Sequence, residues 1–227
     1  SSIFITKWVI FLVLYWKKKF ITIRTINNGE NMNKLLTLIA SITIFLVSSL
    51  HADVGDYKFG VDLGVSPVEL EAEETAQQLA NLSGSTVTTE YDTGAFVGRL
   101  FGTYGVAQAI DIEAGYFRSS SMDATYKIGA DSAKESYTAS GIDLSANFKS
   151  DTGFYGKAGM HSSTIDGAAS LTIGSTTYSL TDSADGSSWL VGAGLESNNI
   201  RYSWTHYNNV GGDGGADFNV FSVGFLF

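Results

Sequence analysis

Apolar and polar side chains alternate strictly in eight separate segments of this chain, and strict alternation predicts a β-strand with two different faces. The segments are 57–65, 96–104, 110–116, 142–148, 154–160, 189–195, 200–204 and 221–227. No apolar face carries a charge, although 16% of all residues are charged. The opposite faces carry ten charges: Lys58, Asp62, Arg99, Asp111, Glu113, Asp143, Lys149, Lys157, Glu196 and Arg201. The pattern predicts an all-β fold with one apolar and one charged side.

The connections between these segments alternate between long and short. The long ones are 66–92, 117–136, 162–187 and 208–218, and the short ones are 105–108, 149–152 and 197–199. A membrane barrel has short turns on its periplasmic side and long loops outside, whereas a soluble barrel has no such requirement. The alternation therefore favours strands that cross a membrane with their apolar faces toward lipid.

Aromatic residues mark both ends of the predicted strands, as expected for girdles at the two lipid–water boundaries. The predicted girdles are Tyr57, Tyr104, Phe148, Phe154 and Phe227 at the short-turn end, and Phe96, Tyr116 and Trp189 at the long-loop end. An open sheet edge in lipid leaves backbone groups unsatisfied, so the last strand must pair with the first. We therefore predict a closed antiparallel eight-stranded up-and-down transmembrane β-barrel, with the ten charges forming a network that fills its narrow lumen.

Two charge contacts follow from this topology. The Asn-Asn pair 198–199 suits a two-residue type I′ turn, because Asn tolerates positive φ. That turn places Glu196 directly opposite Arg201, so we expect the two charges to pair. The turn between the second and third segments brings Arg99 near Glu113 by a similar argument.

The N-terminal residues are expected to lie outside the mature fold. Met32–Ala52 has a short basic start, an apolar core and small residues before a cleavage point, which is typical of a secretory signal peptide. Residues 1–31 are expected to be an upstream extension. Their apolar patch Trp8–Trp16 is too short to span a bilayer, which disfavours the alternative of a membrane anchor. The predicted barrel domain is 53–227.

The chain resembles the small eight-stranded outer-membrane barrels of Gram-negative bacteria, the OmpA transmembrane-domain and OmpX-like group of the porin family. The resemblance lies in the signal segment and in the stretches Tyr57–Gly64, Gly192–Glu196 and Asn219–Phe227. The ending is similar to the signal that the barrel assembly machinery reads, through Phe221, Val223, Phe225 and Phe227. The resemblance implies an outer-membrane location, contact with outer-membrane lipid and lipopolysaccharide, and loops that act in adhesion or surface resistance.

Composition excludes several other functions. The chain has no cysteine, so it has no disulfide, thiolate metal site or thiol nucleophile. With 14 Lys and Arg against 23 Asp and Glu it lacks the basic footprint of a nucleic-acid binder. We predict no catalytic, cofactor or metal site. The expected role is envelope structure and surface interaction through long extracellular loops, and the alternative is a narrow cation-preferring pore.

A third possibility, a lipid A-modifying enzyme, is disfavoured by the histidines. The stretch after His206 resembles the His-x-Ser-Asn motif of outer-membrane lipid A deacylases, but Asn208 takes the place of the nucleophilic serine. His161 and Ser163 have the right spacing, yet they fall on the predicted lumen face and lack the surrounding motif. Interface and lumen histidines are the favoured interpretation.

The long loops carry three further features. Residues 69–82 predict a short helix whose Glu69, Glu71, Glu73 and Glu74 form either a cation or partner site or a solvated acidic surface. The glycine-rich stretch 211–217 resembles one calcium-binding repeat, and a flexible surface loop is favoured. Residues 165–180 are rich in β-forming side chains and predict a hairpin that, by analogy with OmpX-like barrels, binds partners by strand addition.

Overall fold

The computed structural model describes residues 54–68, 70–212 and 215–227. The predicted extension 1–31 and signal peptide 32–52 lie outside the described residues. The described elements, in chain order, are β1 (Tyr57–Pro67), α3 (Ala72–Ser83), β2 (Thr88–Tyr91), β3 (Gly94–Ala107), β4 (Ile110–Ser119), β5 (Met122–Ile128), β6 (Asp131–Lys149), β7 (Phe154–Ile173), β8 (Thr176–Ser197), β9 (Ile200–Val210) and β10 (Ala216–Leu226). Each of the eight predicted segments lies within one of these strands, apart from the terminal Phe227, which follows β10.

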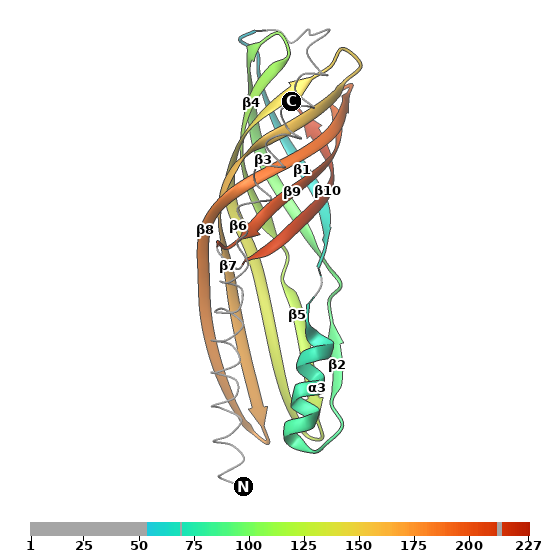
Figure 1. Cartoon of the computed structure of the whole chain (residues 1–227), viewed down its shortest axis with the longest axis vertical. Coiled ribbons are helices and arrows are strands. Elements are labelled where there is room, and N and C mark those ends of the chain that lie inside the picture. The colour runs from blue at the N-terminus through green and yellow to red at the C-terminus, as the bar shows by residue number, and fades with distance from the viewer. Residues whose placement is uncertain (1–53, 69, 213–214) are drawn as a thin grey trace, which may run out of the picture.

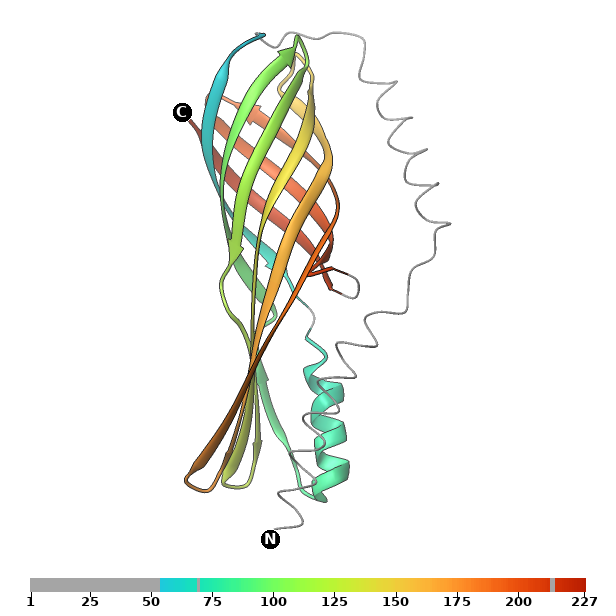
Figure 2. The same ribbon diagram turned by 90° about the vertical axis from the view of Figure 1, so that its left-hand side faces the viewer.

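Eight strands form a closed antiparallel ring in the order β1, β3, β4, β6, β7, β8, β9 and β10. The ring closes where β1 pairs with β10, with Val61 opposite Phe225 and Leu63 opposite Val223. Figure 2 shows the barrel from the side, with its short turns at the top. The predicted eight-stranded closed barrel is confirmed. The ring therefore presents no open strand edge, with unpaired backbone N–H and C=O groups, to the lipid.

The two faces of the ring have opposite character. On the outer wall Leu100, Ile142 and Met160 are each 61–64% exposed, whereas the inward-facing Arg99 and Glu113 are at most 5% exposed. A soluble barrel would bury its apolar side chains and expose its charges. The observed arrangement is stable only if the outer wall faces hydrocarbon. Among the described residues, no helix combines the length and the apolar character needed to cross a bilayer.

The sheet continues beyond the long-loop end of the barrel. Strands β6, β7 and β8 are 19, 20 and 22 residues long and continue well beyond the ring. With β2 and β5 they form the order β2, β5, β6, β7, β8, drawn in the lower half of Figures 1 and 2. We call this the extracellular sheet. The β7–β8 hairpin was predicted, and it turns at Gly174 with φ 59°.

The connection 117–136, expected as a loop, is instead mostly strand. Strand β4 continues to Ser119, β5 follows, and a tight turn at Gly129 leads into β6. The apolar side chains of this hairpin, Ala124, Tyr126 and Ala133, are buried on one face of the sheet. Residues 122–128 do alternate between apolar and polar side chains, but the segment is short and polar residues flank it, so the sequence prediction placed it in a loop.

Helix α3 covers part of the extracellular sheet. The helix predicted over 69–82 is confirmed and occupies Ala72–Ser83. Its buried side chains join those of the sheet in one apolar cluster: Ala72, Leu79, Ala124, Tyr126, Ala133 and Leu171. Gly84 ends the helix in the left-handed conformation and donates its N–H to the Ala80 carbonyl at 2.9 Å. The sheet therefore has a small core of its own outside the barrel.

The turn at 198–199 has the predicted geometry, with φ of 50° at Asn198 and 66° at Asn199. A β-branched residue is strained at such a φ, whereas Gly is not. We expect Asn199→Val to lower the free energy of unfolding by about 1–2 kcal/mol and Asn199→Gly to leave it unchanged or raised. Urea titration of the refolded barrel measures both. Equal stability of the two variants would contradict a left-handed turn.

Candidate functional site

The interior of the barrel centres on one carboxylate that contacts three cations. The Glu113 carboxylate lies 2.8 Å from Arg99 Nη2, 2.8 Å from Lys157 Nζ and 2.5 Å from Arg201 Nη1. Glu113 is 0% exposed. A buried carboxylate is tolerated only when opposite charges and hydrogen bonds replace water, and here three strands supply them.

Two further carboxylates complete this cluster. Asp143 accepts hydrogen bonds from Arg99 Nε at 2.8 Å and from Arg99 Nη2 at 2.5 Å, a two-point contact that fixes the guanidinium plane. Asp62 lies 3.2 Å from Arg99 Nη1 and 2.7 Å from Arg201 Nη2. We call these six residues the ionic core: Asp62, Arg99, Glu113, Asp143, Lys157 and Arg201. Its three positive and three negative charges balance.

The other four predicted lumen charges form a separate group near the short turns. Lys149 lies 2.6 Å from Asp111 and 3.1 Å from Glu196, and Lys58 also lies 3.1 Å from Glu196. The Lys58 side chain is 42% exposed, so this group is open to water at its end. All ten predicted charges thus make ion pairs, in two groups rather than one continuous network.

The sequence predicted correctly that Glu196 lies opposite Arg201, but the two side chains do not form an ion pair with each other. Glu196 does face Arg201 across the β8–β9 turn. Arg201, however, reaches Glu113 and Asp62, and Glu196 reaches the two lysines, because long side chains cross the narrow interior and find partners on other strands. The predicted approach of Arg99 to Glu113 is confirmed by their 2.8 Å contact.

Inward-facing glycines make room for the largest interior side chains. A Cβ at Gly60 would lie 2.2 Å from the Phe101 ring, and one at Gly115 would lie 2.5 Å from Arg99 Nη2. The Phe101 ring in turn lies under the Arg201 guanidinium, 4.0 Å from its centroid. Cation–π contact adds to the ion pairs of that guanidinium.

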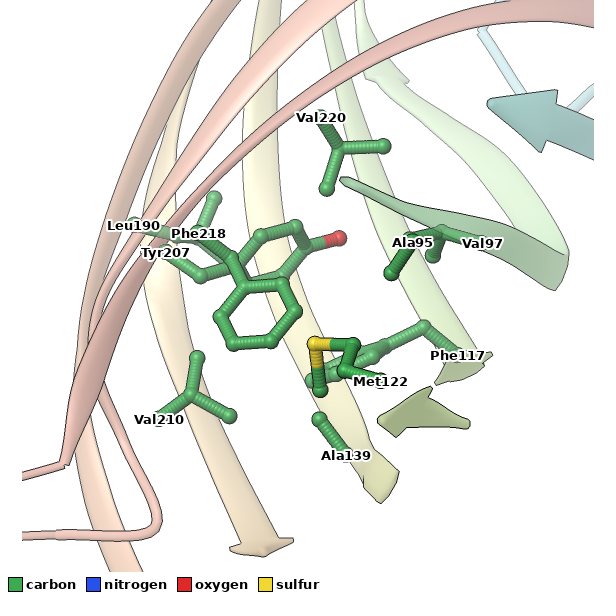
Figure 3. Close-up of a cluster of buried hydrophobic side chains, with 10 residues drawn as sticks. All are labelled: Ala95, Val97, Phe117, Met122, Ala139, Leu190, Tyr207, Val210, Phe218 and Val220. Carbon is green, nitrogen blue, oxygen red and sulfur yellow. The ribbon is translucent and has the colours of Figure 1, made fainter. Parts of the chain in front are cut away.

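An apolar layer lies between the ionic core and the extracellular sheet, drawn in Figure 3. Its buried residues are Ala95, Val97, Phe117, Met122, Ala139, Leu190, Tyr207, Val210, Phe218 and Val220. The Phe117 and Tyr207 rings are 4.7 Å apart, and the Tyr207 hydroxyl donates to Asp143 at 3.2 Å, which joins this layer to the ionic core.

The sequence prediction missed this layer, although a signal for it exists. Near the long-loop end alternation gives way to adjacent apolar residues, in Phe96-Val97, Tyr116-Phe117, Trp189-Leu190 and Val220-Phe221. Such pairs place an apolar side chain on both faces of a strand at the same height. They therefore mark where the interior, as well as the outer wall, becomes apolar.

His161 and Ser163 contact each other, but in a buried structural arrangement. His161 Nε2 lies 2.8 Å from the Asn208 carbonyl oxygen, so this nitrogen carries the proton and Nδ1 accepts from Ser163 Oγ at 3.1 Å. Ser163 Oγ also accepts the Gly211 N–H at 3.0 Å. Both side chains are at most 4% exposed, which leaves no room for an ester. The contacts instead hold the β9–β10 connection against β7.

The other residues considered for chemistry are dispersed. His206 lies on the outer wall, with Nδ1 3.1 Å from Asn219 Oδ1 and its ring 5.2 Å from that of Trp189. Of the predicted acidic group, Glu69 lies outside the described residues, and Glu73 and Glu74 lie in the first turn of α3, where the helix dipole favours them. Residues 213–214 of the glycine-rich stretch also lie outside. Within the described part of the chain, no three His, Asp or Glu side chains gather closely enough to hold a metal ion.

The predicted girdle residues lie near the ends of the ring strands. Most are at least 38% exposed on the outer wall, and Phe148 and Trp189 are half-buried. Tyr57 and Tyr104 stack across β1 and β3 with ring centroids 4.6 Å apart. The side chains of the predicted assembly signal, Phe221, Val223, Phe225 and Phe227, all face outward and are exposed. Their roles as membrane girdle and assembly signal stay predictions.

One long edge of the extracellular sheet is unpaired. Strand β8 pairs with β9 only from Leu190 onward, and the β9–β10 connection packs against Gly186, where a Cβ would lie 2.0 Å from Gly212 Cα. Among the described residues, none therefore pairs with 176–183 on that side. Tyr178 and Leu180 lie on the face that α3 partly covers, yet they remain 48% and 46% exposed. The segment contains none of the Lys, Pro or bulges with which natural proteins protect such edges.

Charged contacts stabilise the outer part of this sheet. Asp123 on β5 lies 2.7 Å from Lys134 on β6, and the hydrogen bond from that lysine, with another from Ser121, lowers the pKa of Asp123 to about 2. The Glu73 carboxylate beside the Tyr91 hydroxyl raises the pKa of that phenol. Both contacts are exposed, so salt screens them.

The Asp123 contact predicts a pH dependence. Because the pKa in the folded state lies below the unfolded value of about 3.9, its contribution is complete above about pH 4 and is lost as pH falls through 2. We expect Asp123→Asn to speed amide exchange in β5 at pH 6, with the difference from the wild type shrinking as pH falls through 2 and vanishing by about pH 1. Lys134→Met should behave in the same way. A difference that stays undiminished at about pH 1 would contradict the ion pair.

Comparisons with known proteins find similarity only among solved structures, at low identity. No described protein family matches the chain, and no curated protein does. Among solved structures, the attachment invasion locus protein Ail of Yersinia pestis is 10% identical, with 77% of this chain and 100% of Ail covered and a TM-score of 0.43. The outer membrane protein OprG from Pseudomonas aeruginosa is 12% identical, with 79% and 99% covered and a TM-score of 0.42. These likenesses carry no argument about function.

The chain's own geometry identifies it as a membrane barrel. The ring closes without a free edge, its outer wall is apolar, and its charges are buried in ion pairs. A bilayer requires the closed ring and the apolar outer wall, and that outer wall would be unfavourable in water. The chain is an eight-stranded transmembrane β-barrel of the outer-membrane type.

Proposed function

We propose that this barrel is a non-enzymatic outer-membrane protein whose lumen is closed and whose extracellular sheet acts in surface interaction. Two layers support closure. The ionic core crosses the interior through Glu113 and its three cations, and the apolar layer lies on its long-loop side. An ion that crosses would have to break buried ion pairs and then pass an apolar constriction, and each step is costly.

Planar-bilayer conductance tests the closed lumen against the alternative of a narrow cation-preferring pore. We expect the wild-type barrel to give no steady current steps. Heat-modifiability on a gel, measured on the same sample, shows that the protein is folded, because a closed barrel migrates compactly until it is boiled. Ion-selective steps from a fully folded sample would contradict closure and support the pore.

The proposed surface interaction is supported by the edge of β8 at residues 176–183, which no described strand pairs with. We propose that an extended segment of an extracellular partner adds to this edge as a further strand. In the two-residue turn that joins β7 and β8, the flanking residues Ile173 and Thr176 form a hydrogen-bonded pair, and the ladder alternates from there. Thr177, Ser179, Thr181 and Ser183 therefore direct their backbone N–H and C=O groups to the free side.

That alternation gives a sharp test. Thr181→Pro removes one outward N–H and leaves the ladder to β7 intact, and Thr181→Val keeps the N–H as a matched control. The probe is adherence of a non-adherent Gram-negative strain, expressing each variant, to wells coated with extracellular-matrix proteins. We expect adherence with the wild type and Thr181→Val, and at least a fivefold loss with Thr181→Pro. Equal adherence of all three variants would overturn strand addition.

A further inference from the structure

Helix α3 covers only part of the extracellular sheet. Five strands about 4.8 Å apart span about 19 Å, whereas one helix covers about 10 Å of a sheet. Figure 1 shows α3 beside β2 and β5, with the β7–β8 hairpin at the opposite side of the sheet. Among the described residues, the apolar cluster under α3 draws on β5, β6 and β7 and on none from β8. A strip about one helix wide is therefore left uncovered.

This uncovered strip lies on β7 and β8 and is apolar toward the tip of the sheet. Cross-strand register places Ala169 beside Leu180 and Leu171 beside Tyr178, and all four side chains point to the α3 side. Tyr178 and Leu180 keep about half of their surface exposed. Exposed apolar side chains that gather on one face mark a binding surface.

Helix α3 gives the strip a border. Residues four apart share one side of a helix. Glu73 accepts a hydrogen bond from the Tyr91 hydroxyl of β2 at 3.3 Å, so the side of α3 that carries Glu73 faces β2. Glu74, Gln78 and Leu82 lie along the other flank, toward β7 and β8, and Leu82 is 57% exposed. The border is therefore acidic at one end and apolar at the other.

The two sides of the extracellular sheet differ in charge. On the side opposite α3, Lys127 and Lys134 each pair with a carboxylate. On the α3 side of 71–91, 122–137 and 167–184, the described residues include no Lys, Arg or His. The carboxylates on that side are Glu71, Glu73, Glu74, Asp131, Glu135 and Asp182. The α3 side therefore favours a ligand with positive charge.

Glu135 is the most buried of these carboxylates. It lies on β6 between Ala124 of β5 and Ala169 of β7, and it is 4% exposed. Its carboxylate accepts a hydrogen bond from the Tyr137 hydroxyl at 3.1 Å, and no cation within the described part of the chain pairs with it. A buried carboxylate without a cation is costly, so contact with an ammonium or guanidinium group is favourable there.

We propose that the uncovered strip binds a cationic amphipathic helix of an extracellular partner, which lies beside α3. Its apolar side contacts Tyr178, Leu180 and Leu82, and its Lys and Arg side chains pair with the carboxylates of the α3 side. A helix suits this surface because the strip is the face of a sheet, and helices pack on such faces. The inference rests on the proposed role of the extracellular sheet in surface interaction, but it uses a different surface from the β8 edge.

The test measures binding of a synthetic peptide to the whole barrel in nanodiscs of phosphatidylcholine. The probe is a dye-labelled peptide of about 14 Leu and Lys residues with its leucines on one side of the helix. Its length of about 21 Å matches the length of 167–173, about 20 Å. Fluorescence anisotropy compares loaded with empty nanodiscs, and we expect at least about tenfold tighter binding to the loaded ones. A peptide with Glu in place of Lys should show no such preference.

Substitutions on β8 locate the site, each with a matched control on the opposite face of the same strand. Leu180→Ser removes an apolar contact and should weaken binding at least about fivefold, whereas Thr181→Val should change it less than about twofold. Asp182→Asn should weaken binding about threefold at low salt and have no effect at about 1 M salt, because the ion pair is screened. Asp185→Asn removes the same charge from the other face and should bind like the wild type.

Thr181→Pro separates this site from strand addition at the β8 edge. It removes an outward N–H but leaves the α3 side of β8 unchanged, so binding of the Leu/Lys peptide should persist in this variant. Heat-modifiability shows that every variant is folded. Equal binding to loaded and empty nanodiscs, equal binding by Leu180→Ser and the wild type, or loss of binding in Thr181→Pro would each overturn helix docking. None of these results changes the adherence expected from the free edge.

Discussion

Replacing Glu113 with Gln is expected to lower the free energy of unfolding by about 3–5 kcal/mol, the usual cost of removing one partner from a buried ion pair. The side chain is fully buried and contacts Arg99, Lys157 and Arg201 at once. The substitution leaves three buried cations facing the carboxylates of Asp62 and Asp143 alone. All six residues of the ionic core are at most 5% exposed, so bulk solvent screens the excess charge little.

Urea unfolding of the refolded protein measures this loss, with two matched variants. Glu90→Gln removes an exposed carboxylate 3.9 Å from Lys127 and should change stability by less than 1 kcal/mol. The double variant Glu113→Gln with Lys157→Met restores charge balance in the ionic core and should recover more than half of the loss. A Glu113→Gln protein as stable as Glu90→Gln would show that the buried charges are hydrated.

The barrel was predictable because lipid imposes a simple rule on every second residue. Lipid-facing positions such as Leu63, Leu144 and Phe225 must be apolar along the whole strand, and closure of the sheet follows from the absence of water. The turn at 198–199 was predictable for a local reason, since two Asn residues tolerate the positive φ that a type I′ turn requires. Both predictions depend on constraints that act within one strand or one turn.

The partners of the charges were less predictable because they depend on distances across the barrel. Register set Glu196 beside Arg201, but each side chain is long enough to reach a partner on another strand, and the interior offers better ones. The extracellular sheet had weak signals for a different reason. Its outward face carries Ser and Thr, as at Thr138 and Ser170, and these hydroxyl residues also occur in loops. The pairing of β5, β6, β7 and β8 and the packing of α3 on the other face identify it as a sheet.

Gly159→Val is expected to prevent formation of the compact barrel, because at this position the neighbouring strand itself fills the space of a side chain. A Cβ at Gly159 on β7 would lie 2.1 Å from the Leu144 carbonyl oxygen and 2.6 Å from Ser145 Cα on β6. Both are backbone atoms, so no rotamer change relieves the clash. The β6–β7 ladder would have to separate, and each backbone group released in lipid costs several kcal/mol.

Gly98→Val is the matched control, since Gly98 also lies in a ring strand but points to open space. There the larger side chain adds apolar surface toward lipid and improves β-propensity, so stability should be unchanged or higher. Heat-modifiability reads out both variants: we expect a compact band for Gly98→Val and none for Gly159→Val, even after slow refolding into detergent. A heat-modifiable Gly159→Val would mean that β6 and β7 can move apart without loss of the barrel, and the close backbone approach would then not limit the fold.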